Sequence, residues 1–430
     1  MVYKDALDFL YSQLPAFTRI GAAAYKANLD NIQALCKAFD HPEKDLKVVH
    51  VAGTNGKGSS SHYLASILQE AGYKTGLFTS PHLKDFRERF RVNGKMMPKR
   101  FVGAFVRNSK PIIESIQPSF FEMTVVLAFL WFKQQKVDIA VIETGLGGRL
   151  DSTNVVEPEL SLVTNIDLDH TDLLGDTIEK IATEKAGIIK SGIPVVVSEY
   201  SDKSADVFKT KAFENHSRIH FASDEIKWLK SELVNTISGL TLVCEGAWKN
   251  KRIEFSSPLT GGYQLHNLKG VWLTVEMLKK IGWKISDDAL RSGIQNVISN
   301  TNLQGRWQQL REKPDVFCDT GHNTAGIKEV LKQIQAHPHE QLRFVFGMVK
   351  DKSIDAVLEI MPKDAIYYFC KANLFRAMDA QELKEKAKKF GLEGNSFESV
   401  KLAYKSAIKE SNTSDLIVVG GSTFVVAEVI

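Results

Sequence analysis

Apolar and polar residues are arranged along the first two hundred positions in a pattern that predicts strands and helices in alternation. Short runs rich in β-branched and aliphatic residues are typical of buried strands, and the segments between them carry apolar residues at helical spacing. The expected strands lie at 48–52, 75–79, 137–144, 160–166 and 193–198, and helices are expected at 62–71 and 178–189. Such alternation favours a parallel sheet flanked by helices.

Beyond about residue 200 the pattern changes. Residues 201–260 mix Ser, Lys and Asp with short apolar pieces, and we expect a peripheral antiparallel extension without a chemical motif. Two helices, at 265–281 and 287–297, then lead to a polar, glycine-ended connection at 300–305 that is typical of an interdomain linker.

A second alternating unit follows this linker. Its expected strands lie at 316–318, 342–346, 366–369 and 416–419, and its expected helices at 327–334, 380–390 and 400–408. The pattern predicts a small Rossmann-like domain. We therefore expect two domains, at 1–302 and 303–430.

The strongest chemical signal is the glycine-rich loop after the first expected strand, which reads Gly53, Thr54, Asn55, Gly56, Lys57, Gly58 and Ser59. Glycines let backbone N–H groups turn toward a phosphate, the next helix N-terminus favours the same anion, and the lysine supplies a charge for terminal phosphates. The spacing departs from a standard P-loop, because Gly53 lies three residues before Gly56 instead of five. A tight turn is the alternative interpretation. The predicted fold class is α/β, a P-loop-containing parallel-sheet ATPase domain followed by a smaller Rossmann-like α/β domain.

Composition and charge argue against several classes of protein. The 430 residues are 43% apolar and 25% charged, with a formal net charge of +4. No basic tract is longer than 384–389, so nucleic acid is not an expected partner. None of the four cysteines belongs to a Cys-x-x-Cys pair, which argues against a zinc site or a disulfide scaffold. The first residues lack a secretory signal and the apolar run at 125–132 is too short to span a bilayer, so we expect a cytoplasmic protein without a membrane segment.

Polar groups also follow other expected strands. Ser80 could ligate magnesium, although an ordinary turn with Pro81 at its corner is the alternative. Glu143 ends a strand just before a glycine-rich loop, and a carboxylate there is typical of Mg²⁺ sites in nucleotide enzymes. His170 follows two aspartates, a cluster that suits either a metal site or a hydrogen-bonded turn. Because ligands sit at the carboxyl ends of parallel strands, one pocket could collect these groups.

Taken together, these motifs resemble the folylpolyglutamate synthase and dihydrofolate synthase family, within the wider Mur ligase group. The resemblance spans nearly the whole chain except about 201–260. It rests on 53–59, 79–83, 143–154, 165–170, 184–190, Gln264, Asn267, 305–307, 319–323, 346–352 and 420–422. Thr320, where the family has Ala or Gly, and Thr324, where Pro is usual, depart from the family pattern without removing Asp319 or His322.

The resemblance implies a ligase that activates a carboxylate with ATP and joins it to the amine of L-glutamate. The implied partners are ATP, L-glutamate and dihydropteroate or tetrahydrofolate, with Mg²⁺ as cofactor, and a monomer is expected. We expect both dihydrofolate synthase and folylpolyglutamate synthase activities. Attack of one anion on another needs metal ions, a lysine and backbone donors more than a protein nucleophile, and the motifs above supply those groups.

The resemblance also implies roles for individual residues. ATP is assigned to the loop 53–59 with Asn267, Arg306 and Asp319, the last two from across the domain interface, and magnesium to Ser80, Glu143 and His170. The implied catalytic residues are Lys57, Lys185 and His322. The implied folate-binding residues are Phe121, Glu122, Thr124, Arg149, Leu150 and Asp151. Lys185 is implied to be N-carboxylated, whereas its position alone predicts a surface charge. Plain core packing is the alternative for Phe120 and Phe121.

Other functions stay open at this stage. The nearest is a monofunctional folylpolyglutamate synthase that lacks one of the two substrates. A Mur-type cell-wall ligase fits less well, because the Gly-Lys-Gly-Ser loop and the Ser-Pro-His segment resemble the folate branch. A nucleotide-binding switch or motor would use the same loop without ligase chemistry.

Overall fold

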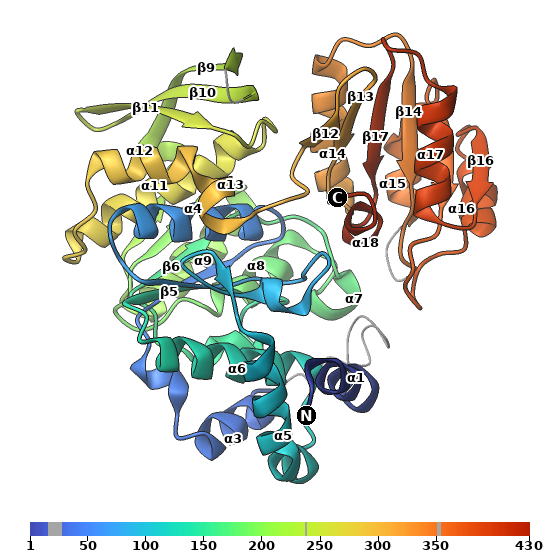
Figure 1. The fold of residues 1–430 in the computed structure, drawn as a ribbon. Coiled ribbons are helices and arrows are strands. Elements are labelled where there is room, and N and C mark those ends of the chain that lie inside the picture. The colour runs from blue at the N-terminus through green and yellow to red at the C-terminus, as the bar shows by residue number, and fades with distance from the viewer. Residues whose placement is uncertain (16–27, 237–238, 351–353) are drawn as a thin grey trace. The chain divides into compact units, whose positions relative to one another are not determined.

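The computed structural model describes residues 1–15, 28–236, 239–350 and 354–430 of the chain. These residues form two compact units (Figure 1), one made of Met1–Pro258 with Gln264–Leu303 and the other of Leu259–Tyr263 with Gln304–Ile430. Asp351 and Lys352, at the end of one family motif, lie outside the described residues.

The larger unit is built around an eight-stranded sheet with the order β4-β3-β2-β5-β1-β6-β7-β8. The strands β2, β5, β1, β6, β7 and β8 are parallel to one another, whereas β3 and β4 form an antiparallel edge beside β2. The strands are β1 (Val48–Ala52), β2 (Thr75–Phe78), β3 (Phe90–Val92), β4 (Lys95–Met96), β5 (Ile139–Glu143), β6 (Leu160–Val163), β7 (Val195–Val197) and β8 (Ile219–Phe221). The five strands expected in this part of the chain are confirmed.

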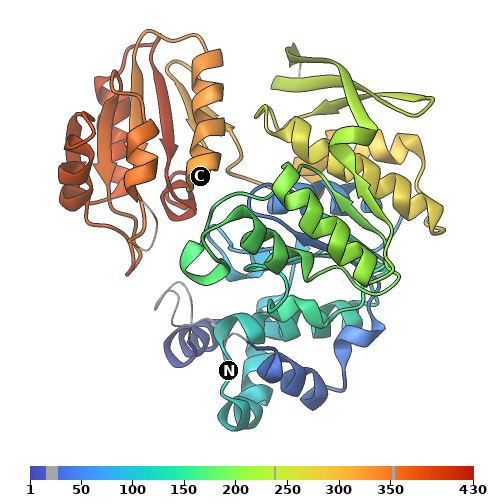
Figure 2. The same ribbon diagram turned by 180° about the vertical axis from the view of Figure 1, so that it is seen from behind.

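Helices cover both faces of this sheet (Figures 1 and 2). One face carries α4 (Lys57–Glu70), α11 (Gln264–Lys280), α12 (Asp287–Gln295) and α13 (Val297–Thr301). The other carries α6 (Phe120–Gln135), with α1 (Tyr3–Gln13), α3 (Asp30–Ala38) and α5 (Lys99–Ile116) packed around it, and α8 (Ile178–Ala186) with α9 (Asp202–Glu214). Short helical turns complete the unit: η2 (Pro42–Asp45), η3 (Phe86–Arg89), η4 (Ser152–Val155), α7 (Thr171–Leu174) and α10 (Ala222–Glu225).

The apolar run at 125–132 lies inside α6, which is buried on nearly all sides between the sheet and the outer helices. A helix that is apolar all round needs such a position. Its start is fixed by a capping box in which Ser119 Oγ accepts from Glu122 N–H at 3.2 Å and Glu122 Oε2 accepts from Ser119 N–H at 2.6 Å. None of the helices in the described ranges is long and apolar enough to cross a bilayer.

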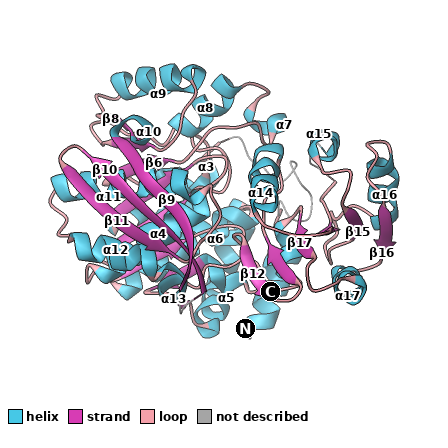
Figure 3. Ribbon diagram, turned by 90° about the horizontal axis from the view of Figure 1, so that it is seen from above, coloured by secondary structure: helices cyan, strands magenta, loops and turns pink. Residues whose placement is uncertain are grey.

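The expected antiparallel extension is confirmed for only part of 201–260. An antiparallel sheet of β9 (Ile226–Thr236), β10 (Gly239–Trp248) and β11 (Lys251–Ser257) lies over α11 and α12 (Figure 3). The expectation is wrong for α9 and β8, which extend the main helix layer and the main sheet. Ala205, Phe208 and Ala212 of α9 do have helical spacing and are buried, but charged residues between them mask the pattern.

The smaller unit has a six-stranded sheet with the order β12-β13-β17-β14-β15-β16, parallel except for β12. Its strands are β12 (Gln308–Arg311), β13 (Asp315–Cys318), β14 (Leu342–Phe346), β15 (Ile366–Cys370), β16 (Gly394–Phe397) and β17 (Leu416–Gly420). Its helices are α14 (Thr324–Ala336), α15 (Ile354–Ile360), α16 (Ala380–Lys388), α17 (Val400–Glu410) and α18 (Thr423–Ala427). The Rossmann-like prediction is confirmed, while β12, β16, α15 and α18 were not predicted.

Candidate functional site

The glycine loop leaves β1 near the centre of the larger sheet and is tied to the segment that follows β6. Thr54 N–H donates to the Asn165 carbonyl at 2.9 Å, and Asn55 N–H donates to Asn165 Oδ1 at 2.7 Å. Thr164 Oγ1 donates to the Asn55 carbonyl at 2.5 Å. The last three residues of the glycine loop, 57–59, already belong to helix α4, which begins at Lys57 with no side-chain cap on its first turn. This is the arrangement that an anion-binding helix N-terminus requires.

Gly56 turns the chain into α4 with φ +81°, and a Cβ there would overlap Asn267 Oδ1. Asn267 lies on α11, is buried, and donates from Nδ2 to Gln264 Oε1 at 2.8 Å. Gln264 Nε2 in turn donates to Ser59 Oγ at 3.3 Å. The structure thus brings the predicted nucleotide residue Asn267 against the loop, although more than two hundred positions separate them in sequence.

Two lysines converge on one carbonyl oxygen of the loop. Lys57 Nζ donates to the carbonyls of Gly53 at 2.9 Å and Thr54 at 3.1 Å, and Lys185 Nζ donates to Gly53 O at 2.8 Å. Lys185 is 3% exposed, and burial, with the neighbouring charge of Lys57, lowers its pKa to about 7. The interpretation of Lys185 as a surface charge is therefore wrong. Local spacing on α8 could not reveal this, because the burial comes from β1 and its loop.

The predicted magnesium residues Ser80 and Glu143 lie side by side at the tips of β2 and β5. Ser80 N–H donates to Glu143 Oε2 at 3.2 Å, and Glu143 is 3% exposed. Thr79 N–H donates to the carbonyl of Arg89 at 3.2 Å, which fixes the turn from the other side. A buried carboxylate next to a hydroxyl at this edge provides hard oxygen donors of the kind that Mg²⁺ prefers.

His170 lies in the segment that connects β6 to α7, seven residues after the last residue of β6, and it precedes α7 with φ +50°. Its N–H donates to Asp169 Oδ1 at 2.9 Å, so the hydrogen-bonded turn is real. In the described residues no group of three or more His, Cys, Asp and Glu side chains could hold a metal. A bound Mg²⁺ would therefore need the Ser80 hydroxyl, water and phosphate oxygens as well, which is its usual habit.

The predicted folate residues fall into two neighbouring segments, and several of their side chains already have partners. Glu122 forms the capping box of α6, and Thr124 Oγ1 donates to the Phe121 carbonyl at 2.7 Å. Phe121 itself is half-buried and its ring fills the space where a Cβ on Gly145 would lie. Phe120 is buried in the core, in agreement with the alternative of plain core packing for that residue.

The second folate segment, 149–151, lies in the loop between β5 and η4. Asp151 is 3% exposed and accepts from Leu146 N–H at 2.7 Å and Thr153 N–H at 3.0 Å. Burial raises the pKa of Asp151 despite these donors. Arg149 is exposed and pairs with Glu184 at 2.7 Å, while Leu150 is half-buried.

Arg306, Asp319 and His322 lie together in the smaller unit, at the carboxyl end of β13. Asp319 accepts from Trp307 N–H at 2.7 Å, Gly321 N–H at 2.8 Å and the Tyr263 hydroxyl at 2.6 Å. Burial raises the pKa of Asp319, and the Arg306 guanidinium opposes that rise. The sequence reasoning did not identify Tyr263, and the Gly261-Gly262 pair before it was the available signal.

Thr320 and His322 are joined to the same group. Arg306 donates to Thr320 Oγ1, and His322 Nδ1 is 3.0 Å from the Thr320 carbonyl. The departure from the family pattern at Thr320 thus supplies a hydroxyl that contacts the predicted nucleotide residue Arg306.

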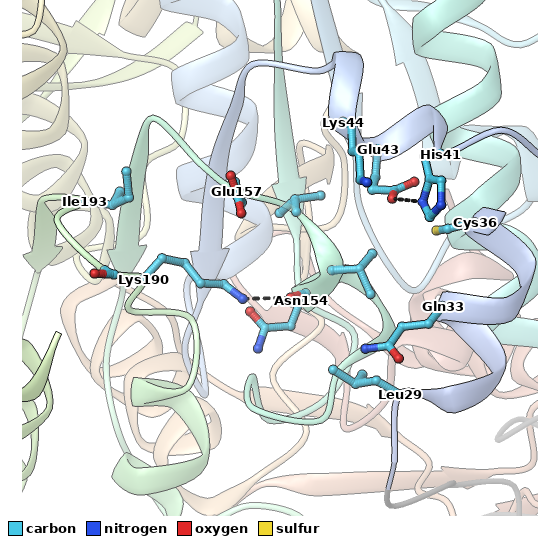
Figure 4. Close-up of a pocket in the computed structure, with 13 residues that line it drawn as sticks. Leu29, Gln33, Cys36, His41, Glu43, Lys44, Asn154, Glu157, Lys190 and Ile193 are labelled. Atoms are coloured by element: carbon cyan, nitrogen blue, oxygen red, sulfur yellow. Dashed lines mark hydrogen bonds and ion pairs between the residues drawn. The ribbon is translucent and has the colours of Figure 1, made fainter.

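A pocket with a volume of about 610 Å³ lies elsewhere in the larger unit (Figure 4). Its lining residues come from α3, from η2 and from the segments that precede β6 and β7, so it faces the amino ends of the strands. Lys190 Nζ donates to the Asn154 carbonyl at 2.8 Å, and His41 pairs with Glu43 at 2.9 Å. All predicted site residues are described by the structure, and none of them lines this pocket.

Comparisons with known proteins agree with these two units. The Mur ligase middle domain model matches residues 51–275, and the Mur ligase glutamate ligase domain model matches residues 305–423. A dihydrofolate synthase/folylpolyglutamate synthase of Bacillus subtilis is 35% identical over 401 residues, which cover 90% of this chain and 90% of that protein.

Solved structures are similar over the whole chain. Escherichia coli FolC in complex with DHPP and ADP has a TM-score of 0.85 and 29% identity, covering 100% of this chain and 97% of that one. The bifunctional folylpolyglutamate synthase/dihydrofolate synthase of Yersinia pestis, complexed with AMPPNP and Mn ion, has a TM-score of 0.82 and 28% identity over 100% and 97% of the two chains. The resemblance drawn from the motifs is confirmed.

The contact between Gly56 and Asn267 can be tested separately from the backbone strain that a side chain at Gly56 would introduce. Gly56→Ala should weaken ADP binding by roughly tenfold or more, because the added methyl group displaces Asn267 from the loop. Gly72→Ala is the matched control: Gly72 also has a positive φ, +89°, but a Cβ there would meet nothing within 4 Å. Titration calorimetry with ADP measures the effect, and equal affinity in both variants would show that the Asn267 contact does not matter.

Proposed function

We propose that this chain, which belongs to the folylpolyglutamate synthase and dihydrofolate synthase family of Mur ligases, joins L-glutamate to folates in an ATP-dependent reaction. Its acceptors are dihydropteroate and tetrahydrofolate with its polyglutamates, so the enzyme is bifunctional. The B. subtilis relative and the Y. pestis structure both carry the two activities in their names.

The observation that carries this proposal is the pair of lysines on the Gly53 carbonyl, beside the carboxylate of Glu143 one strand away. An enzyme that transfers a phosphoryl group to a carboxylate must hold two anions together. It therefore needs concentrated positive charge and backbone donors at one point. The loop provides both, and a protein nucleophile is not required.

In the first step, the N–H groups of the loop and Lys57 hold the triphosphate of ATP. An oxygen of the folate carboxylate attacks the γ-phosphorus, the bond from that phosphorus to the β,γ-bridging oxygen breaks, and ADP leaves with the electron pair. The product is an acyl phosphate. Asn267 fixes the loop for this step by its contact with Gly56, and Arg306 and Asp319 are assigned to the nucleotide by the family resemblance.

In the second step, the amine of L-glutamate attacks the carbonyl carbon of the acyl phosphate. The bond from that carbon to the bridging oxygen breaks, inorganic phosphate leaves, and the amine loses a proton. His322 is assigned to this step as a residue that positions the intermediate. Water must be kept out, because it would compete with the amine for the same carbon.

Ser80, Glu143 and His170 would hold the magnesium ion of this reaction. The bound ion would neutralise charge on the phosphate oxygens during transfer. The chain contributes a carboxylate that is buried and oriented by the Ser80 N–H, so its position is set before substrates arrive.

Lys185 is proposed to be N-carboxylated. The protonated lysine first loses one proton; the neutral amine nitrogen then adds to the carbon of CO₂ and releases a second proton, so a cation is replaced by an anion. With its pKa lowered to about 7, a large share of Lys185 is neutral near pH 7, unlike an exposed lysine. The change of sign also removes the repulsion between Lys185 and Lys57.

A cytoplasmic location is part of the proposal. The four cysteines are buried and free, which suits a reducing compartment.

The function is tested by ADP release. With ATP and Mg²⁺, we expect ADP to be released with dihydropteroate and with tetrahydrofolate, in each case only when L-glutamate is also present, because the acyl phosphate turns over by reaction with the amine. A coupled ADP assay measures this. Release with one pterin alone would identify a monofunctional enzyme, and release independent of both pterin and L-glutamate would indicate a nucleotide switch or motor.

N-carboxylation is tested by chemical rescue. Lys185→Ala should lose most activity and regain part of it with acetate or propionate, which can replace the carbamate anion. Lys57→Ala is the matched control and should not be rescued, because the lost group is a cation.

The pH dependence has a defined sign. Because protonation of the amine opposes reaction with CO₂, the carbamate signal of Lys185 in carbon-13 NMR should grow as the pH rises from about 6 to about 8. Absence of both rescue and signal would contradict the modification.

A further inference from the structure

Arg89 is a nearly buried arginine that none of the predicted site sets includes. It ends η3, and its side chain is 4% exposed. The guanidinium lies over the ring of Phe120 at 5.6 Å, and its Nε–H donates to His82 Nδ1 at 2.8 Å. Tyr11 stacks on the same Phe120 ring at 4.9 Å and is 3.3 Å from His82 Nε2. The guanidinium is therefore held at a fixed place and angle.

This place lies between the predicted metal residues and the predicted folate segment. The Arg89 carbonyl accepts from Thr79 N–H, and the next residue, Ser80, donates to Glu143. Strand β2 separates β3 from β5 in the sheet, so Arg89 is on the far side of Glu143 from the glycine loop. Phe120, which its guanidinium covers, begins α6 beside Phe121.

The guanidinium of Arg89 carries two terminal NH₂ groups besides Nε–H. In the parts of the chain that the structure describes, neither terminal NH₂ group has a hydrogen-bond or ion-pair partner. Two other arginines do have acidic partners: Arg87 pairs with Asp85 at 2.7 Å, and Arg343 pairs with Asp415 at 2.8 Å. A desolvated guanidinium without a directly paired anion is costly, and two parallel N–H groups match a carboxylate.

Burial lowers the pKa of Arg89 only to about 10, so the side chain is still a cation at neutral pH. The charges of Glu143 and Glu88 also act on Arg89, but neither carboxylate forms an ion pair with it among the described residues, so its terminal N–H groups can take an anion from a ligand. The triphosphate has its own donors in the glycine loop, on the other side of Glu143. The substrate carboxylate has to approach from the side where the folate segment lies.

We propose that Arg89 binds the carboxylate of the pterin substrate that is to be phosphorylated. This inference rests on the proposed function and adds a substrate-binding residue to it. The two terminal N–H groups of Arg89 donate to the carboxylate, one of whose oxygens keeps a lone pair for attack on the γ-phosphorus, and the arginine charge reduces the repulsion between the two anions. Tyr11 and His82 are positioning residues, because they act only through Arg89.

A thermodynamic cycle tests the contact. Dihydropteroate and its carboxamide analogue, in which the carboxylate is replaced by a neutral amide, are titrated into the wild type and into Arg89→Met. The wild type should bind dihydropteroate roughly 10- to 100-fold more tightly than the carboxamide, the range expected for a hydrogen-bonded charge pair. Arg89→Met should bind the two nearly equally. Equal preference for the carboxylate in both proteins would overturn the proposal.

Kinetics and a matched control separate this role from a structural one. Arg89→Met should raise KM for dihydropteroate and leave KM for ATP within about twofold, since the triphosphate has other donors. Arg91→Met is the control: Arg91 is also buried, at 6% exposure, but donates to the Gly94 carbonyl at 3.3 Å. Arg91→Met should leave the KM for dihydropteroate and the KM for ATP unchanged. A rise in the KM of ATP alone would instead make Arg89 a phosphate-binding residue and contradict the proposal.

Two further measurements keep the result decisive. If Arg89→Met does not fold, as judged by its thermal unfolding midpoint, Arg89→Lys replaces it; this variant keeps the charge but not the paired N–H groups, so its preference for the carboxylate should fall only in part. The wild type and Arg91→Met are also assayed for glutamate-dependent ADP release. Release in these two proteins without an effect at Arg89 rejects the inference alone, whereas no release in either rejects the proposed function.

Discussion

Two lysine ammonium groups share one carbonyl oxygen at the tip of the central strand, and the chemistry of the site follows from what is needed to hold them there. Lys57 and Lys185 both donate to Gly53, and Lys185 is almost wholly removed from water. Like charges in such a place are stable only if one is neutralised or an anion is nearby. The pKa of Lys185 is lowered to about 7, so much of this lysine is neutral near pH 7. A bound triphosphate would supply the nearby anion.

The sheet order distributes the remaining groups around this point. Glu143 ends β5, which lies between β2 with the Ser80 turn and β1 with the glycine loop. Strands β5 and β2, which carry the proposed metal residues Glu143 and Ser80, thus lie between the glycine loop on one side and β3 on the other. Arg89 lies beyond β2, on the side away from β5. A cation therefore lies on either side of Glu143, Lys57 at the proposed triphosphate site and Arg89 at the proposed carboxylate site.

The sequence predicted the elements whose signal is local, and missed the features that depend on distant packing. Buried strands such as β1 and β5 are runs of apolar residues, so their positions were right to within a residue or two. The burial of Lys185 could not be predicted, because α8 carries it against a loop that lies over a hundred residues away. Arg89 was missed for the same reason, since its neighbours Tyr11 and Phe120 come from other helices. The motif residue Glu122 also has a local task, the capping of α6, that family resemblance does not show.

The proposed ligase reaction depends on phosphorylation of the substrate carboxylate at this site. The most direct measurement uses dihydropteroate labelled with oxygen-18 in its carboxylate, turned over with ATP and L-glutamate, and follows the label by phosphorus-31 NMR. If an acyl phosphate forms and is broken at its carbonyl carbon, one labelled oxygen appears in inorganic phosphate for each amide made. Amide formation with unlabelled phosphate would contradict the account.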